Sequence, residues 1–502
     1  MASVSLPPPV GGLDQRESLA DMPADHAVVL DNFFPDTDRV SIRRGNSSFA
    51  TGMTGNVETL IEYTPQTGTG ELFAANAGKI YDVSAAGAVG VAVVTGKAND
   101  RWQYSQLGNS AGHFVRLFNG ADTPLLYNGS TWVTTAIHGS GLTPANLVWT
   151  NTHQNRMWFG EKDSLSAWYL ATSSVSGSAT EFPLKGVAKL GGYIMAMGTW
   201  TRDAGDGMDD VACFLTSEGE VIVYTGTDPS ATATWSLIGN FHIGRPIGRR
   251  CMVQAGTDLI LITQDGFVPL SRILTMDRSQ SRMVALSDQI SSAVTTAVRE
   301  FGTIYGWQPI LYPKASMLIF NIPQSVIKSH QFVFNTITGS PCRFTGINAV
   351  CWGLMDDNAY WGGADGVVYK FDDGNSDNGA NIEADAIQAF NYFGSPASNK
   401  IFTQLEPIFE SDSNPNAAVE INVDFKILQT LAVPQASSAD AGAWDSAVWD
   451  ASVWGSDGDI YDGWRGVRGR GRAGSVRVRI NTNSARPSWI ATNVNFTRGG
   501  GF

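Results

Sequence analysis

The sequence predicts an all-β fold: a β-propeller of about six or seven blades, with an extended N-terminal arm, one helical insertion and a C-terminal antiparallel β domain. Three observations predict the propeller. A unit of strand, tight turn and strand recurs between about residues 38 and 373, the units repeat at the length of a blade, and their strands are apolar at consecutive positions. We therefore expect an arm over 1–37, a propeller over 38–379 and a C-terminal domain over 380–502.

The arm is predicted from its prolines and glycines. Residues 1–37 contain SLPPPVGG, DMPAD and FFPD, which favour an extended chain over a packed unit. Such an arm reaches a neighbouring subunit or lies along its own domain. A strand at 40–43, VSIR, follows and is expected to close the propeller by pairing into the last blade.

The repeated unit is a β-hairpin. Its turns have the cores NAGK, NGAD, EKDS, SEGE, QDGF and GADG, which supply Gly, Asn or Asp where a hairpin requires a positive φ. Successive units end 46, 42, 55 and 46 residues apart, close to the length of a four-stranded blade, at Tyr81, Tyr127, Tyr169, Tyr224 and Leu270.

The strands of these units do not alternate between apolar and polar residues. The runs 220–224 and 259–262 are almost entirely apolar, as expected of strands buried on both faces between stacked blades. Two or three stacked β-sandwiches built from the same hairpins are the alternative fold.

One helix interrupts the hairpins. Between about 281 and 301, apolar residues recur every three or four positions, Arg299 stands in the last turn and Gly302 ends the pattern. The apolar positions are Met283, Leu286, Ile290, Val294 and Val298. We interpret this segment as an insertion and not as a blade.

The pattern after Gly379 is true alternation. Apolar residues occupy every second position from Val419 to Ile427 and from Val476 to Ile480, with polar or charged residues between them. This alternation predicts a separate antiparallel β domain with one buried and one solvated face.

Charge is divided within that domain. Residues 430–462 carry six Asp and no Lys or Arg, whereas 463–502 carry eight Arg and no acid. The arginines can grip DNA phosphates, pair with a neighbouring subunit or pair with the Asp-rich stretch of their own chain. The candidate contact residues are Arg43, Arg44, Arg465, Arg468, Arg470 and Arg472.

Three tryptophans recur every five residues within the Asp-rich stretch, at Trp444, Trp449 and Trp454. Exposed aromatic rings beside acids can stack on sugars, whereas an indole cluster can also fasten a loop to its own sheet or to a neighbouring subunit. These tryptophans are the remaining candidate contact residues.

Composition and motifs argue against an enzyme and against a cofactor. The four cysteines form no CxxC pair, and no GxSxG, P-loop or repeated Asp-box is present. Two Asp-rich loops, at 202–210 and 373–379, resemble calcium loops, but the second lacks the diagnostic Gly and Glu, and we interpret both as ordinary loops. We expect no catalytic residues, no metal and no cofactor.

Net charge and the start of the chain limit where the protein acts. Its 34 Lys and Arg against 47 Asp and Glu give a net charge of −13, which opposes free association with DNA or anionic membranes. The first residues, MASVSLPPPVGG, lack the basic and apolar regions of a signal peptide. We expect synthesis in a cytoplasm and a soluble product.

Several motifs resemble the tail proteins of short-tailed bacteriophages. They begin with VGGLDQRESL at 10–19 and VLDNFFP at 29–35, and continue with VSIRRG at 40–45. Further along the chain stand GGYIMAM at 191–197, SEGEV at 217–221, YTGTDP at 224–229, GRPIGRR at 244–250 and TQDG at 263–266. The resemblance covers roughly residues 10 to 290.

The proteins it resembles form the tail nozzle, the distal tail tube of the virion. The resemblance implies a homo-oligomeric ring, typically a hexamer, below the portal and adaptor, with surfaces for the adaptor and for tail fibres or spikes. It also implies a channel that retains the phage DNA, conducts it during ejection without sequence-specific binding, and meets the host envelope at the tail tip.

We therefore expect a non-enzymatic virion structural protein that forms the tail nozzle. An acidic tube wall would repel DNA phosphates and let the genome slide, which is consistent with the net charge of −13. The alternatives are a carbohydrate-binding receptor protein at the tail tip that uses Trp444 to Trp454, and a propeller glycosidase.

Overall fold

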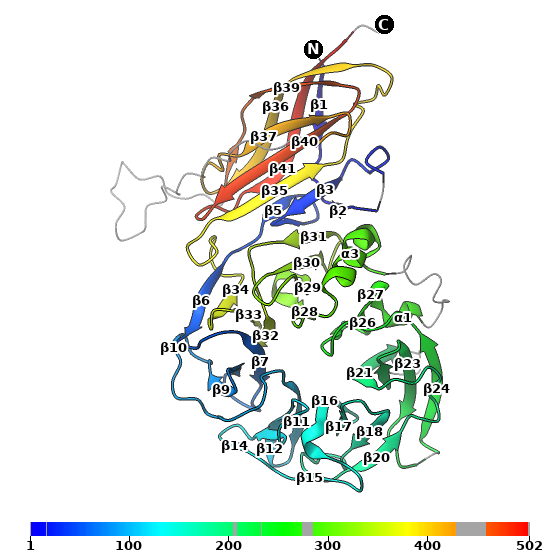
Figure 1. Cartoon of the computed structure of the whole chain (residues 1–502). Coiled ribbons are helices and arrows are strands. Elements are labelled where there is room, and N and C mark those ends of the chain that lie inside the picture. Colours follow the sequence, from blue (N-terminus) through cyan, green and yellow to red (C-terminus); the bar gives the residue numbers. More distant parts are fainter. Residues whose placement is uncertain are drawn as a thin grey trace.

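The computed structural model describes residues 2–16, 18–203, 208–231, 233–273, 285–427 and 458–499. Figure 1 shows two parts: a ring of small sheets, and a β-sandwich at the end where both termini lie. Among the described residues, no helix is long and apolar enough to cross a membrane.

The ring is a β-propeller, as predicted. Seven sheets of the described chain surround a common centre, and the first strand of each lies innermost. The first four blades are β7 (Val57–Tyr63), β8 (Glu71–Asn76) and β9 (Lys79–Asp82); β11 (Gln103–Asn109), β12 (Gly112–Phe118), β13 (Leu125–Tyr127) and β14 (Trp132–Val133); β16 (Leu147–His153), β17 (Arg156–Glu161), β18 (Ser166–Tyr169) and β20 (Thr180–Pro183); and β21 (Ile194–Asp203), β22 (Met208–Thr216), β23 (Glu220–Gly226) and β24 (Trp235–His242).

The last three blades complete the ring. They are β25 (Met252–Ala255), β26 (Asp258–Thr263) and β27 (Gly266–Pro269); β28 (Gln308–Tyr312), β29 (Met317–Pro323), β30 (Ser329–Asn335) and β31 (Pro341–Phe344); and β32 (Cys351–Met355), β33 (Asn358–Gly362), β34 (Val368–Phe371) and β6 (Asn46–Thr51). Two short parallel pairs flank the blades: β10 (Gly87–Ala88) on β6, and β15 (Ile137–His138) with β19 (Gly177–Ser178).

The strand that closes the ring is β6, not the stretch at 40–43. β6 pairs antiparallel with β34 and supplies the outer strand of the last blade. The earlier residues form β5 (Val40–Ile42), which pairs with strands of the sandwich. The prediction of a closing strand was therefore wrong in its residues, because β5 is a short, fully buried strand that the core of the sandwich takes up.

Strands inside the propeller are buried on both faces. Every residue of β29 and of β30 is buried, as the consecutive apolar runs predicted. Aromatic rings fill the space between blades: Trp158 of the third blade stacks against Trp235 of the fourth at 5.7 Å between ring centroids. The alternative of stacked sandwiches is thereby replaced by a propeller.

The helical insertion is shorter than predicted. α1 (Leu270–Ile273) follows β27, and α3 (Ser291–Phe301) precedes β28 after a 3-10 turn at Asp288–Ile290. The expected helix over 281–301 therefore begins only at Ser291, and its first residues, 281–284, lie outside the described chain. Leu286 and Ser287 are not helical because both bind the backbone of Phe267 in the last strand of the fifth blade. The Leu286 N–H donates to the Phe267 carbonyl, and the Ser287 hydroxyl accepts from the Phe267 N–H.

The sandwich is built from both ends of the chain. One sheet has the order β38 (Asp459–Tyr461), β36 (Lys400–Ser411), β41 (Ser488–Arg498), β5 and β4 (Phe33–Pro35), with β39 (Arg465–Gly471) on β36 and β1 (Ala2–Leu6) on β41. The other contains β3 (His26–Asp31), β35 (Ile382–Gln388), β40 (Gly474–Thr482) and β37 (Ala418–Val423), with β2 (Gly12–Leu13) on β3. Residues 1–37, expected as an arm, thus contribute four strands that pair within their own chain.

The predicted alternation of the C-terminal domain describes β40 well. Val476, Val478 and Ile480 are buried and face rings such as Phe402 and Trp489 from the other sheet, in one core. The alternation predicted up to Ile427 ends early, because the chain turns at Asp424 and Phe425, which both have positive φ.

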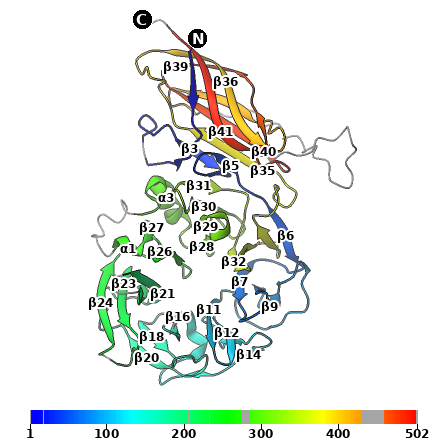
Figure 2. The same cartoon turned by 180° about the vertical axis from the view of Figure 1, so that it is seen from behind.

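The propeller and the sandwich share one sheet. The sixth blade continues through β31 into β3, β35, β40 and β37, which makes a nine-stranded sheet across both parts (Figure 2). At the crossing point, Arg343 of the blade binds Asp31 of the sandwich through two hydrogen bonds of 2.7 and 2.6 Å. The two parts are therefore joined by a continuous hydrogen-bonded sheet, not by a linker.

The two chain crossings between these parts lie side by side. Gly45 and Asn46 enter the propeller and exchange backbone hydrogen bonds with residues 373–378, which leave it. A Cβ at Gly45 would lie 1.9 Å from the carbonyl oxygen of Ser376, so only glycine fits there. We call this pair of crossings, with Arg43 and Asp377, the joint.

Candidate functional site

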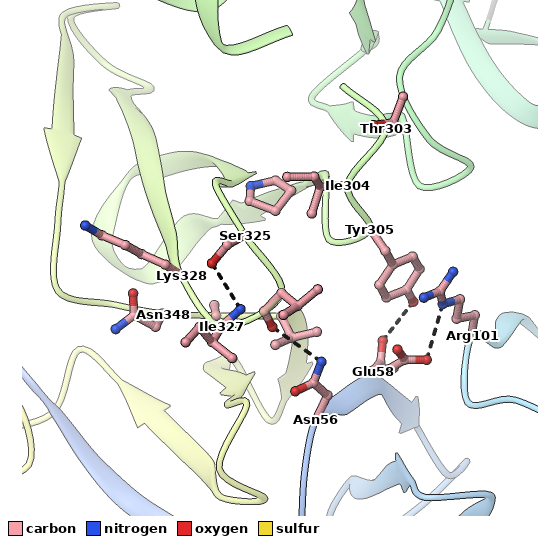
Figure 3. Close-up of a pocket in the computed structure, with 14 residues that line it drawn as sticks. Asn56, Glu58, Arg101, Thr303, Ile304, Tyr305, Ser325, Ile327, Lys328 and Asn348 are labelled. Atoms are coloured by element: carbon pink, nitrogen blue, oxygen red, sulfur yellow. Dashed lines mark hydrogen bonds and ion pairs between the residues drawn. The ribbon is translucent and has the colours of Figure 1, made fainter. Parts of the chain in front are cut away.

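Three cavities lie along the axis of the propeller. A cavity of about 260 Å³ opens at one axial face between the start of the first blade, the loop at 303–305 and the turn at 325–328 (Figure 3). Two further cavities, of about 310 and about 210 Å³, follow along the axis. We call these the mouth, the outer cavity and the inner cavity.

The mouth has a polar wall and an apolar rim. Glu58 accepts a hydrogen bond from Arg101 at 3.3 Å, and the Tyr305 hydroxyl donates to the Glu58 carbonyl at 2.8 Å (Figure 3). The Arg101 guanidinium lies over the Tyr305 ring, 4.5 Å from its centroid. On the rim, Val326 and Ile327 at the β29–β30 turn are 70% and 64% exposed.

Arg250 ties four blades together across the axis. Its Nη2 donates to the Thr59 hydroxyl at 2.6 Å and to the Trp102 carbonyl at 3.1 Å, and its Nη1 donates to the Glu58 carbonyl at 3.2 Å. A fourth bond, of 3.4 Å, reaches Gln308. The side chain comes from the loop before β25, so it links the fifth blade to the first, second and sixth.

Its neighbour Arg249 is bonded much less. Its Nη1 donates to the Met195 carbonyl at 3.3 Å, and its guanidinium lies 5.4 Å from the centroid of the Tyr193 ring. Burial lowers the pKa of Arg249 below its ordinary value, and the neighbouring Tyr193 and Asp163 offset only part of that effect. The axis therefore holds a partly desolvated cation.

The cysteines and two of the histidines are not poised for catalysis. Burial raises the pKa of the Cys251 and Cys351 thiols to about 12, and those of Cys213 and Cys342 rise as well. Burial lowers the pKa of His153 and His330 to about 4. In the described ranges, no three His, Cys, Asp or Glu side chains are grouped so that they could hold a metal ion. The expectation that the chain is not an enzyme stays a prediction.

Arg43 and Arg44, predicted as contact residues, differ in their surroundings. Arg44 is exposed, but Arg43 has no exposed side-chain surface. All five N–H donors of Arg43 are used: two on Asp377, and one each on Asn32 and on the carbonyls of Arg44 and Thr345. The contact prediction therefore does not hold for Arg43, which is a structural residue of the joint.

The C-terminal arginines form the edge of the sandwich. Arg465, Arg468 and Arg470 are exposed on β39, Arg472 follows them, and Arg465 also donates to the Ala417 carbonyl. On β40, which follows β39 in sequence but belongs to the other sheet, Arg477 binds Asp385 through bonds of 2.9 and 2.5 Å. Pairing with the Asp-rich stretch stays a prediction, because residues 428–457, which include Trp444, Trp449 and Trp454, lie outside the described chain.

The two Asp-rich loops have different outcomes. The side chains at 202–209 lie outside the described part of the structure, and Asp210 accepts a hydrogen bond from Thr201 at 2.7 Å. In the second loop, Asp377 binds Arg43 and Asp373 accepts from Ser47. Sequence reasoning treated this loop only as a failed calcium motif and missed its role at the joint. Arg249 and Arg250 were also not among the candidate site residues, although they end the GRPIGRR motif at 244–250.

Comparison with known proteins gives fold-level similarity. No protein-family model and no curated protein matches the chain. Among solved structures, YCF48 from Cyanidioschyzon merolae is 10% identical over 68% of this chain and 97% of its own, with a TM-score of 0.27. AztD from Citrobacter koseri is 12% identical over 61% and 94%, with a TM-score of 0.34. An exo-β-1,3-galactanase from Phanerochaete chrysosporium is 11% identical over 78% and 95%, with a TM-score of 0.30. By the arrangement of its own sheets, the chain is a β-propeller protein that carries a β-sandwich built from its two ends.

Proposed function

We propose that this protein is a structural subunit of a phage tail nozzle, which assembles into a ring with further copies of itself. The motifs that resemble nozzle proteins support the proposal because several of their residues hold parts of the fold together. Arg43 lies in the joint and binds Asn32, Arg249 and Arg250 line a cavity on the propeller axis, and Glu220 binds the loop at 189–190. A resemblance carried by such residues is one of architecture and not of catalysis.

The observation that carries the proposal is a pair of unlike open edges on one sheet. β1 pairs only with β41, and β39 pairs only with β36, so in the described part of the chain no strand continues the sheet beyond either. An open edge presents unpaired backbone groups to another chain. Because β1 and β39 differ, pairing between copies joins unlike surfaces, and such contacts close into a ring when the rotation permits.

The arginines restrict which partner fits the β39 edge. Charged side chains on an edge strand discourage pairing with an arbitrary strand. Arg468 and Arg470 favour a partner with acidic residues, and a second copy of this chain, with a net charge of −13, is acidic overall.

The axis of the propeller is not the channel for the genome in this proposal. Arg250 bridges blades across it, and the cavities along it hold about 210 to 310 Å³ each, the volume of a small molecule. The channel lies instead between subunits, with the propellers around it. Adaptor, fibres and host envelope contact the outside of that ring.

The test is the mass of the assembly. We expect light scattering and native mass spectrometry to show a closed ring, alone or on the adaptor ring. The double variant Arg468→Glu with Arg470→Glu should stay monomeric. A matched control, Lys79→Glu with Lys185→Glu, makes the same charge change on exposed propeller lysines and should assemble normally.

Two results would count against the proposal. A wild-type chain that stays monomeric with and without the adaptor would contradict the nozzle function. A ring that forms equally well from both double variants would leave the ring intact but exclude the β39 edge as its contact.

A further inference from the structure

The outer and inner cavities on the propeller axis share a lining that is rich in hydrogen-bond donors. Gln103, Arg249 and Arg250 line both cavities, and Arg101 also lines the outer one. No Asp or Glu is among the described residues that line either cavity. A buried surface of this kind attracts negative charge, although the protein as a whole is acidic.

The donors differ in how far the fold already uses them. Arg101 is neutralised by Glu58, and Arg250 is held by carbonyl and hydroxyl oxygens. Arg249 has one long hydrogen bond, to Met195, in the described structure. A guanidinium has five N–H donors in a planar fork that matches a carboxylate or a phosphate. Most of the donors of Arg249 therefore remain for a ligand.

A second donor stands beside it. The side-chain amide of Gln103 lines both cavities, and the described residues offer it no hydrogen bond. Its first-blade and fourth-blade neighbours at this level are mostly apolar, among them Leu60, Ala196 and Met197. A ligand here exchanges water for a fixed cation and an amide inside a partly enclosed cavity, where charge-assisted hydrogen bonds are stronger than at the surface.

We propose that the propeller axis binds a small oxyanion, a carboxylate or phosphate group, through the guanidinium of Arg249 and the amide of Gln103. The mouth described above is the path of entry, because it shares Arg101, Thr303, Ile304 and Tyr305 with the outer cavity. The volume of about 310 Å³ fits a small molecule and excludes a protein loop or a DNA duplex. This site goes beyond the nozzle function and does not depend on it.

The test is calorimetric titration of the full chain in chloride buffer, with inorganic phosphate in one arm and citrate in the other. We expect saturable binding of at least one, and the tighter of the two identifies the class of oxyanion. Arg249→Met should weaken it by about tenfold or more, because charge-assisted bonds are lost. Arg249→Lys keeps the positive charge but loses the planar fork of donors, so its affinity for the anion should lie between those of wild type and Arg249→Met.

The control is Arg245→Met, in the same loop. Among the described residues, Arg245 is exposed and pairs with Glu218 at 2.6 Å, so its loss should leave binding unchanged. The proposal is overturned if wild-type protein binds neither probe at millimolar concentration, a result that needs no variant to fold. It is also overturned if folded Arg249→Met binds as tightly as wild type, since the anion then sits elsewhere.

Discussion

Replacement of Arg43 by Met tests whether the joint holds the molecule together. The variant removes five hydrogen bonds and leaves Asp377, only 15% exposed, with an uncompensated charge. Asn46 also donates to that carboxylate, at 2.8 Å, and provides partial relief. Loss of one partner of a buried ion pair costs about 3–5 kcal/mol, and we expect a loss of unfolding free energy in that range.

The matched control is Arg39→Met. Arg39 pairs with Asp38 and Glu410 at the surface, where its side chain is 36% exposed, and such pairs contribute about 1 kcal/mol or less. Urea unfolding followed by tryptophan fluorescence measures both variants, and limited proteolysis reports opening at 372–381. If Arg43→Met is destabilised no more than Arg39→Met and resists protease equally, the reasoning about the joint is refuted.

Three further predictions concern the propeller. Glu220 is buried, and its carboxylate accepts hydrogen bonds from the N–H groups of Lys189 and Leu190 and from the Asn240 amide. Glu220→Ala should therefore lower the unfolding free energy, measured in urea, by about 2–4 kcal/mol. A loss below about 1 kcal/mol would show that water replaces the carboxylate. Gly226 has φ +131°, and a Cβ at this position would lie 1.8 Å from the Thr234 carbonyl oxygen. Gly226→Ala should therefore lower the melting temperature measurably. The control is Gly256→Ala, which should lower the melting temperature less because a Cβ there meets open space. Burial lowers the pKa of His153 and His330 to about 4, below the ordinary value of 6.5. Between these pH values the unfolded chain binds more protons than the folded chain, so the unfolding free energy should fall as pH drops from 6.5 towards 4. His330→Gln should flatten this dependence of stability on pH, and an unchanged slope would contradict the assignment.

The propeller could be predicted because its evidence is local. Each hairpin turn carries its own Gly, Asn or Asp, and each blade strand carries its own apolar run, so the repeat length follows from single windows of sequence. β40 was predictable for the same reason, since the alternation of Val476, Val478 and Ile480 is complete within one strand.

The joint could not be predicted, because its parts meet only in three dimensions. Asn32, Arg43 and Asp377 come from three segments, and the sequence gives no sign that a motif at 373–379 lies against one at 40–45. Residues 1–37 lie along their own domain, which is one of the two outcomes expected of the arm. Their strands could not be predicted because the partners, such as β35 and β41, stand far along the chain. Arg249 belongs to the GRPIGRR motif, but nothing in that motif shows that its side chain lines the propeller axis.

The closure of the ring by β6 has a consequence for how the chain folds during synthesis. Asn46 and Asp377, which hydrogen-bond beside this closure, are separated by 331 residues, so the ribosome makes β6 long before its partner β34 exists. Pairing across such a distance is slow, and an unpaired strand is exposed to aggregation in the meantime. The sandwich shares this delay, because β1 waits for β41. Propeller and sandwich should therefore mature together and late, and chains truncated before about residue 480 should be found with chaperones or in inclusion bodies, not as a soluble, folded propeller.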